Sequence, residues 1–153
     1  MAAGLVINRG SAFNVSDQIT AFLSGGTIAK NDLVNLESGE LLVAGTGDFL
    51  AGIALEAATS SSVDVQVNTT PWLRVVMDND NTGTTFAVTH VGARFDITGT
   101  TGAQIVDTSS VDTSATAPTG TLVCDAFNPQ GIDPSLDSDT SVGLFTIKEH
   151  QLH

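Results

Sequence analysis

The possible folds of this chain are limited above all by the alternation of short apolar runs with turn-forming residues. Residues 48–77, DFLAGIALEAATSSSVDVQVNTTPWLRVVM, show it best and predict short β-strands joined by turns. About seven such segments at roughly ten-residue spacing are typical of an all-β barrel or sandwich. Residues 1–15 show no clear helical or strand period, so we predict an extended N-terminal arm there. We also predict one β-rich domain over residues 16–153, a small barrel or sandwich that includes the open, tulip-like form and has long polar loops.

Local patterns assign the clearest strands. The segments DLVNL and ELLVA predict a hairpin that turns at Ser38-Gly39. FLAGIALEA predicts a strand with a bulge or a close backbone approach at Gly52. SVDVQV alternates, so that one face carries Val63, Val65 and Val67 and the other carries Asp64 and Gln66. The remaining predicted strands are WLRVVM after Pro71, TLVCDAF, and the terminal VGLFTIKEH.

Other segments are less decided. Residues 15–26 fit a short helix capped by Ser16 or Asp17, and they fit a strand equally well. In the strand alternative the inward residues are Ile19, Ala21 and Leu23. FAVTHVGARFDI alternates, with Phe86, Val88 and His90 expected on one side. We predict surface loops with little regular structure over residues 102–120 and 128–141.

The charge is strongly acidic. The chain has 17 acidic and 5 basic residues, for a net charge of −12. Because phosphate binding requires clustered Lys and Arg, and the basic residues are scattered along the sequence, we expect neither nucleic acid nor an anionic membrane as a partner. Solubility alone also explains such acidity. If the protein belongs to a DNA container, the sign places it on the outer face.

Catalytic patterns are missing from the sequence. The single Cys124 lies in an apolar run typical of an inert buried thiol, and no G-x-S-x-G turn is present. His90 is expected at a core edge, whereas His150 and His153 lie near the end, a poor place for a preorganised metal site. Trp72 is expected to anchor the core or a subunit interface. We therefore expect no enzyme activity, no cofactor, and no catalytic, cofactor-binding or metal-binding residues.

One local pattern is reminiscent of a calcium loop. Asp78, Asp80 and Thr82 occupy its first, third and fifth places, and Gly83 its sixth. The twelfth place holds Thr89, where a bidentate Glu is required. A polar hairpin turn is the favoured interpretation, and calcium binding by these residues stays open.

Residues 26–67 resemble the small β-rich decoration, or cement, proteins of tailed bacteriophage capsids. The resemblance rests on Asn31-Asp32 before Leu33-Val34, the glycine turn of the hairpin, the strand Gly52–Glu56, and the alternating valine strand. VGARFDITG, AFNPQG and VGLFTI are similar to longer members from phages of aquatic bacteria. The resemblance implies a homotrimer that binds the major capsid protein and stabilises the shell by bridging coat subunits. It implies no active-site residues.

On this resemblance the protein is expected on the outer capsid surface of the virion, after synthesis in the host cytoplasm. Nothing at residues 1–13 has the basic and then long apolar pattern of a secretory signal, and no apolar run reaches the ~20 residues of a membrane span. The arm is expected to lace protomers together or to grip the coat by adding a strand to a neighbour. The alternatives are a phage surface adhesin or spike domain, or a minor head-tail structural component.

Overall fold

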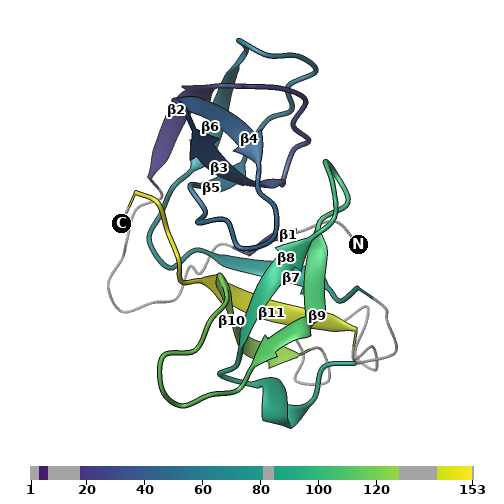
Figure 1. The fold of residues 1–153 in the computed structure, drawn as a ribbon. Helices are drawn as coiled ribbons and strands as arrows, with labels where there is room; N and C mark the ends of the chain where they lie inside the picture. Colours follow the sequence, from purple (N-terminus) through teal and green to yellow (C-terminus); the bar gives the residue numbers. More distant parts are fainter. Residues whose placement is uncertain (1–3, 7–17, 81–84, 128–140, 153) are drawn as a thin grey trace.

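The computed structural model describes residues 4–6, 18–80, 85–127 and 141–152, and it confirms the all-β prediction (Figure 1). The strands form a six-stranded and a five-stranded antiparallel sheet. In the six-stranded sheet the order is β1 (Gly4–Val6), β7 (Arg74–Asp78), β11 (Val142–Ile147), β10 (Leu122–Phe127), β8 (Arg94–Thr98) and β9 (Ile105–Asp112). In the five-stranded sheet it is β2 (Ile19–Leu23), β6 (Asp64–Asn68), β5 (Gly52–Ala54), β3 (Leu33–Glu37) and β4 (Glu40–Val43). The 3-10 helix η1 spans Val88–His90.

The larger hydrophobic core lies between the two sheets. Its residues come from both of them, and they include Leu33 and Ile53 of the five-stranded sheet together with Phe95 and Phe145 of the other. Phe86, Phe95 and Phe145 pack edge to face, with ring centroids 5.4 to 5.8 Å apart. Two sheets that bury their facing sides against each other make the fold a small β-sandwich (Figure 1).

A second, smaller core lies on the other face of the five-stranded sheet, which curls around it. Its buried residues are Ile28, Val34, Leu41, Ala54, Ala58, Val65 and Val67. The curling brings the two outer strands of this sheet together at one bridge, between Ser24 and Leu41. In the six-stranded sheet a similar bridge links β7 to the outer strand β9, where Asn79, directly after β7, bridges Val106. The described residues nevertheless contain no continuous barrel.

The local turn chemistry is confirmed at two places. Ser38 and Gly39 have φ angles of 53° and 87°, the pair of left-handed residues that a two-residue hairpin requires. Gly52 lies against the backbone of β6, because a Cβ atom there would lie 2.0 Å from the carbonyl oxygen of Asn68. The predicted strands after Pro71, over TLVCDAF and at VGLFTI are also present.

Several predictions about strands are wrong. The expected loop over residues 102–120 contains β9, because Ser and Thr side chains suit a strand that is exposed on one face. Residues 88–90 form η1, so that Phe86 is buried while Val88 is exposed. In residues 15–26 the strand is present as β2, but it faces the opposite way. Ile19 and Leu23 are exposed, and Phe22 packs against the smaller core.

The N-terminal arm is described only in part. Residues 4–6 form β1, which pairs antiparallel with β7 of the same chain. The rest of the predicted arm lies outside the described residues. Residues 128–140 of the predicted acidic loop also lie outside them. Val65 and Val67 are buried as the alternation predicts, whereas Val63 precedes β6 and is partly exposed.

Candidate interaction surface

The structure describes only part of the calcium-loop pattern at residues 78–83. Asp78 ends β7 opposite Val142, and the carboxylate of Asp80 accepts a hydrogen bond of 2.6 Å from the hydroxyl of Thr108 in β9. Thr82 and Gly83 lie outside the described residues. Within the described ranges no group of three or more His, Cys, Asp or Glu side chains is placed to hold a metal ion.

His90 and Cys124 lie in structural positions, and His153 lies outside the described residues. His90 is half-buried, as predicted, and its ring packs edge to face against Phe86 and Phe95. Its Nδ1 accepts a hydrogen bond from the Ala87 amide at 3.2 Å. Cys124 is fully buried, and burial is the main reason that its pKa is raised to about 12. A thiol with such a pKa carries almost no thiolate at neutral pH.

A polar junction at Asp32 and Gln104 ties the two sheets together. The buried carboxylate of Asp32 accepts hydrogen bonds from the amides of Ala29 and Gly102, each at 2.8 Å. Gln104, from the turn between β8 and β9, bonds to the main chain of Leu33 in β3. Burial raises the pKa of Asp32, although its two amide donors oppose the effect. Loop residues of one sheet are thereby fixed to the other.

Trp72 is the most prominent exposed side chain. It is 72% exposed, so it does not anchor the core, and only the interface part of its prediction stays open. Its φ angle of 57° is left-handed, a conformation that costs free energy for a bulky side chain. The preceding residues hold this backbone in place. The amide of Thr70 donates to Oδ1 of Asn68 at 3.1 Å, and the amide of Gln18 donates to Oγ1 of Thr70 at 2.9 Å.

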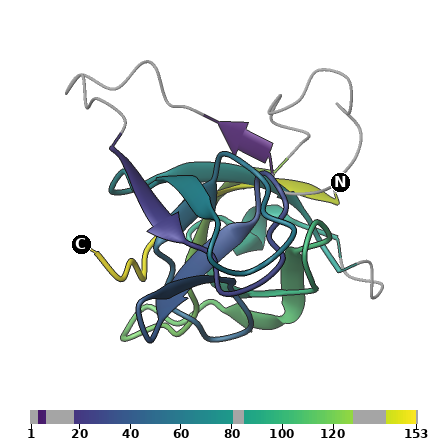
Figure 2. The ribbon, with the colours of Figure 1, turned by 90° about the horizontal axis from the view of Figure 1, so that it is seen from above.

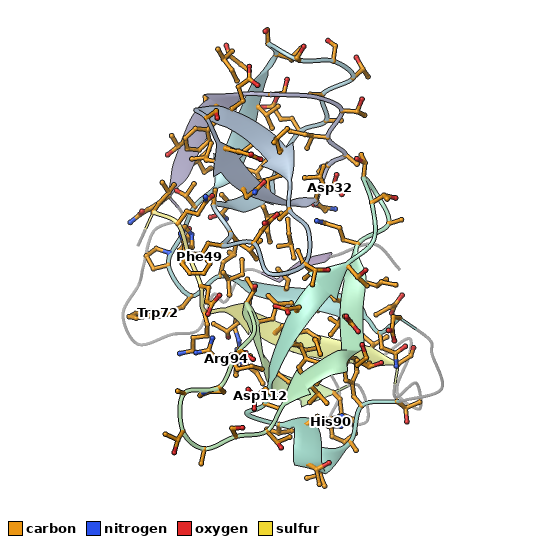
Figure 3. The ribbon with its side chains drawn as sticks, in the orientation of Figure 1. Asp32, Phe49, Trp72, His90, Arg94 and Asp112 are labelled. Atoms are coloured by element: carbon orange, nitrogen blue, oxygen red, sulfur yellow. The ribbon has the colours of Figure 1, made fainter. Side chains whose placement is uncertain are left out.

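Phe49 lies on the same side of the molecule (Figure 3) and is 55% exposed. The segment that follows β11 connects the two aromatic positions. The amide of Ile147 donates to the carbonyl of Leu73 at 3.0 Å, and the amide of Leu50 donates to the carbonyl of Glu149 at 2.8 Å. We call Trp72, Phe49 and the exposed Lys148 between them the Trp72 surface. Two exposed aromatic side chains beside a cation are a common composition of protein interfaces.

The fold also gathers basic residues that are scattered in the sequence. Cα pairing places Arg74, Thr146, Val123 and Arg94 in one row across β7, β11, β10 and β8. Arg74 is paired with Asp125 at 3.2 Å, and Arg94 donates to the carbonyl of Gly120 at 2.8 Å. Because carboxylates lie among them, the row is of mixed charge. It adds polar contacts beside the Trp72 surface and does not make a phosphate-binding patch.

No known protein family matches this chain, and no curated protein matches it in sequence. No helix in the described part of the chain has the length and apolar character needed to cross a membrane. The candidate surface therefore stands on its own geometry. Sequence reasoning singled out Trp72 but missed Phe49 and the row of basic residues. The sequence signal for Phe49 is its position after Asp48 in a glycine-rich turn, whereas the row of basic residues depends on strand pairing.

Proposed function

We propose that the protein is a structural virion component that decorates the outer face of a tailed-phage capsid and stabilises it by bridging neighbouring coat subunits. The observation that carries the proposal is Trp72, an exposed tryptophan on left-handed backbone just after Thr70, which hydrogen bonds with Asn68 and Gln18 hold in place. Strain of this kind persists where the surroundings impose it, and exposed tryptophans are frequent anchors of protein interfaces.

Two further observations support the proposal. The segment that resembles decoration proteins folds into the hairpin, the glycine-containing strand and the valine strand on which the resemblance rests. The net charge of −12 suits a protein on the outside of a DNA-filled shell, because it gives no attraction to the enclosed phosphates. The proposed partner is the major capsid protein, and the proposed assembly is a homotrimer.

The test is the copy number in purified, salt-washed particles, measured by quantitative mass spectrometry. A ratio near one chain per coat subunit is expected of a shell-wide cement protein. A handful of copies per particle, or none, would contradict the proposal. A companion assay adds purified protein to particles that lack it and compares the wild type with Trp72→Ala, which should bind more weakly.

A phage adhesin or spike domain is the second candidate, favoured by the same pair of exposed aromatic residues. Trp72 and Phe49 offer flat apolar faces, on which sugar rings stack in many glycan-binding proteins. This candidate predicts binding to host surface glycans that is lost in Trp72→Ala, together with a low copy number per particle. Glycan-array binding and the copy number therefore separate the two.

A further inference from the structure

Phe49 is exposed, yet the residues on both sides of it are fixed to other parts of the chain. On one side, the carbonyl of Asp48 accepts a hydrogen bond at 3.1 Å from the hydroxyl of the buried Thr121. On the other side, Leu50 is fully buried in the larger core, and its amide donates to the carbonyl of Glu149 at 2.8 Å. The exposed ring of Phe49 is therefore presented from backbone that is held in one place.

The end of β11 and the segment after it supply anchors for both exposed aromatic residues. The amide of Ile147 donates at 3.0 Å to the carbonyl of Leu73, the residue after Trp72. Farther along, the same segment bonds to Leu50, the residue after Phe49. Figures 1 and 2 both show this segment at the edge of the molecule, after it leaves the six-stranded sheet. One short stretch of chain thus connects the two aromatic positions.

Gln151 fastens this stretch to the five-stranded sheet. Its main-chain amide donates to the carbonyl of Leu50 at 2.8 Å. Its side chain bonds to Leu36 of β3 at two points, because Oε1 accepts from the Leu36 amide at 2.6 Å and Nε2 donates to the Leu36 carbonyl at 2.9 Å. Gln151 itself is exposed. We call residues 148–151 the clasp segment.

The strand order of the sheet explains why Leu36 takes a side chain as its partner. The carbonyl of Val34 faces β5 and accepts from the amide of Ala51 at 2.7 Å. Backbone groups of alternate residues point to the same edge of a strand, so those of Leu36 face this edge too. Leu50, the next residue along that edge, bonds to the clasp segment instead. The side chain of Gln151 therefore fills the place of a continuing partner strand.

We propose that Gln151 is a positioning residue of the Trp72 surface. By bonding to Leu36 it keeps the clasp segment docked, and the docked segment holds Phe49 at a fixed spacing from Trp72. The spacing is a property of the free chain, whereas its consequence for binding rests on the proposed function. A partner that contacts both aromatic side chains binds the docked form, so each undocking lowers the apparent affinity. Fixing the two side chains in advance also reduces the entropy lost on binding.

The contribution of the Gln151 side chain is large enough to measure and small enough to remove without unfolding the chain. Two hydrogen bonds of ordinary net strength change an equilibrium constant about tenfold. Both bonds lie at the surface and involve neither hydrophobic core, so the fold should persist without them. Gln151→Ala should therefore undock the clasp segment more often and leave the rest of the sandwich in place.

Hydrogen exchange on the free chain measures the undocking. In Gln151→Ala the amides of Leu36 and Leu50 should exchange about tenfold faster than in the wild type, because both donate to the clasp segment. The amide of Ala54 donates to the carbonyl of Asp32 in the same sheet and should exchange at an unchanged rate. Faster exchange at all three amides would instead mean that the whole sheet is loosened, which would overturn the proposal.

Energy transfer measures the spacing itself. The donor is Trp72, the only tryptophan of the chain, and the acceptor is attached to the variant Phe49→Cys. The native Cys124 is buried with a raised pKa, so it competes little for the label. Adding Gln151→Ala should broaden the distribution of Trp72 fluorescence lifetimes. Adding Gln66→Ala, on a half-buried glutamine of β6, should leave the distribution unchanged.

Binding to decoration-free particles tests the consequence of the spacing. Gln151→Ala should bind at least about twofold more weakly than Gln66→Ala. Equal binding by the two variants, or a lifetime distribution that Gln151→Ala leaves unchanged, would overturn the proposal. Failure of the wild type itself to bind particles would contradict the proposed function alone. In that case the energy-transfer result on the free chain still decides whether Gln151 positions Phe49.

Discussion

Gln104 forms two hydrogen bonds with the main chain of Leu33, 71 residues away: its Oε1 accepts from the Leu33 amide at 2.7 Å and its Nε2 donates to the Leu33 carbonyl at 2.9 Å. The same Nε2 donates to the carbonyl of Ala44 at 2.8 Å. The buried side-chain amide of Gln104 thereby satisfies the backbone N–H and C=O of Leu33 at the start of β3, as a neighbouring strand would. It joins the five-stranded sheet to the turn between β8 and β9.

Gln104→Ala should lower the free energy of unfolding by about 3 kcal/mol, because it leaves a buried N–H and two buried carbonyls without their side-chain partner. Urea denaturation followed by circular dichroism measures the change. Gln66→Ala, on a half-buried glutamine of β6, is the control and should change stability by less than about 0.5 kcal/mol. Similar losses in the two variants would contradict a special role for Gln104.

Gly52→Ala should destabilise the protein by at least about 2 kcal/mol, because its Cβ would lie 2.0 Å from the carbonyl oxygen of Asn68. The strand pair β5–β6 has to separate to make room. Gly26→Ala is the matched control, since a Cβ there meets nothing within 4 Å. A Gly52→Ala protein as stable as the Gly26→Ala protein would show that β5 can shift without cost.

Asp32 should make the stability of the protein fall as pH rises. Its pKa is raised above the ordinary 3.8 mainly by burial, so the folded state holds the proton more tightly than the unfolded state does. Stability from this group is complete below pH 3.8 and is lost as pH rises through the folded pKa.

The difference in unfolding free energy between wild type and Asp32→Asn, measured across this pH range, isolates the effect of Asp32. The wild type should lose stability relative to the variant as pH rises. Asp64→Asn removes the same charge from an exposed position and serves as the control for net charge. A difference that stays flat with pH would mean that Asp32 is as easily ionised in the folded chain as in the unfolded one.

Trp72→Gly should raise the free energy of unfolding by about 0.5–1 kcal/mol, because glycine accepts the left-handed backbone at φ 57° and little buried area is lost. Thermal or urea denaturation measures this gain. The same variant should bind decoration-free particles at least about tenfold more weakly if Trp72 is an interface anchor. Val88→Ala removes a side chain of matched exposure, 73%, at another site and should leave binding unchanged.

Gain of stability combined with loss of binding is the expected signature of strain kept for function. A Trp72→Gly variant that binds particles as well as the wild type would remove the main support for the proposed function. A variant that is less stable would mean that Trp72 makes packing contacts that its exposure conceals.

Features that depend on neighbouring residues could be read from the sequence. The hairpin turn at Ser38-Gly39 and the approach at Gly52 were predictable because glycine and turn residues act through local backbone geometry. The buried face of Val65 and Val67 followed from strict alternation. The all-β class followed from the spacing of such signals.

Long-range packing, by contrast, selects which faces of the strands are buried and which segments lie side by side. The pattern of β2 fits two opposite orientations, and long-range pairing with β6 selects the one that exposes Ile19 and Leu23. β9 was missed because its Ser and Thr residues form a strand only beside β8. Trp72 and Phe49 lie on the same side of the molecule because the chain at the end of β11 bonds to Leu73 and to Leu50, an arrangement of distant segments that no local pattern encodes.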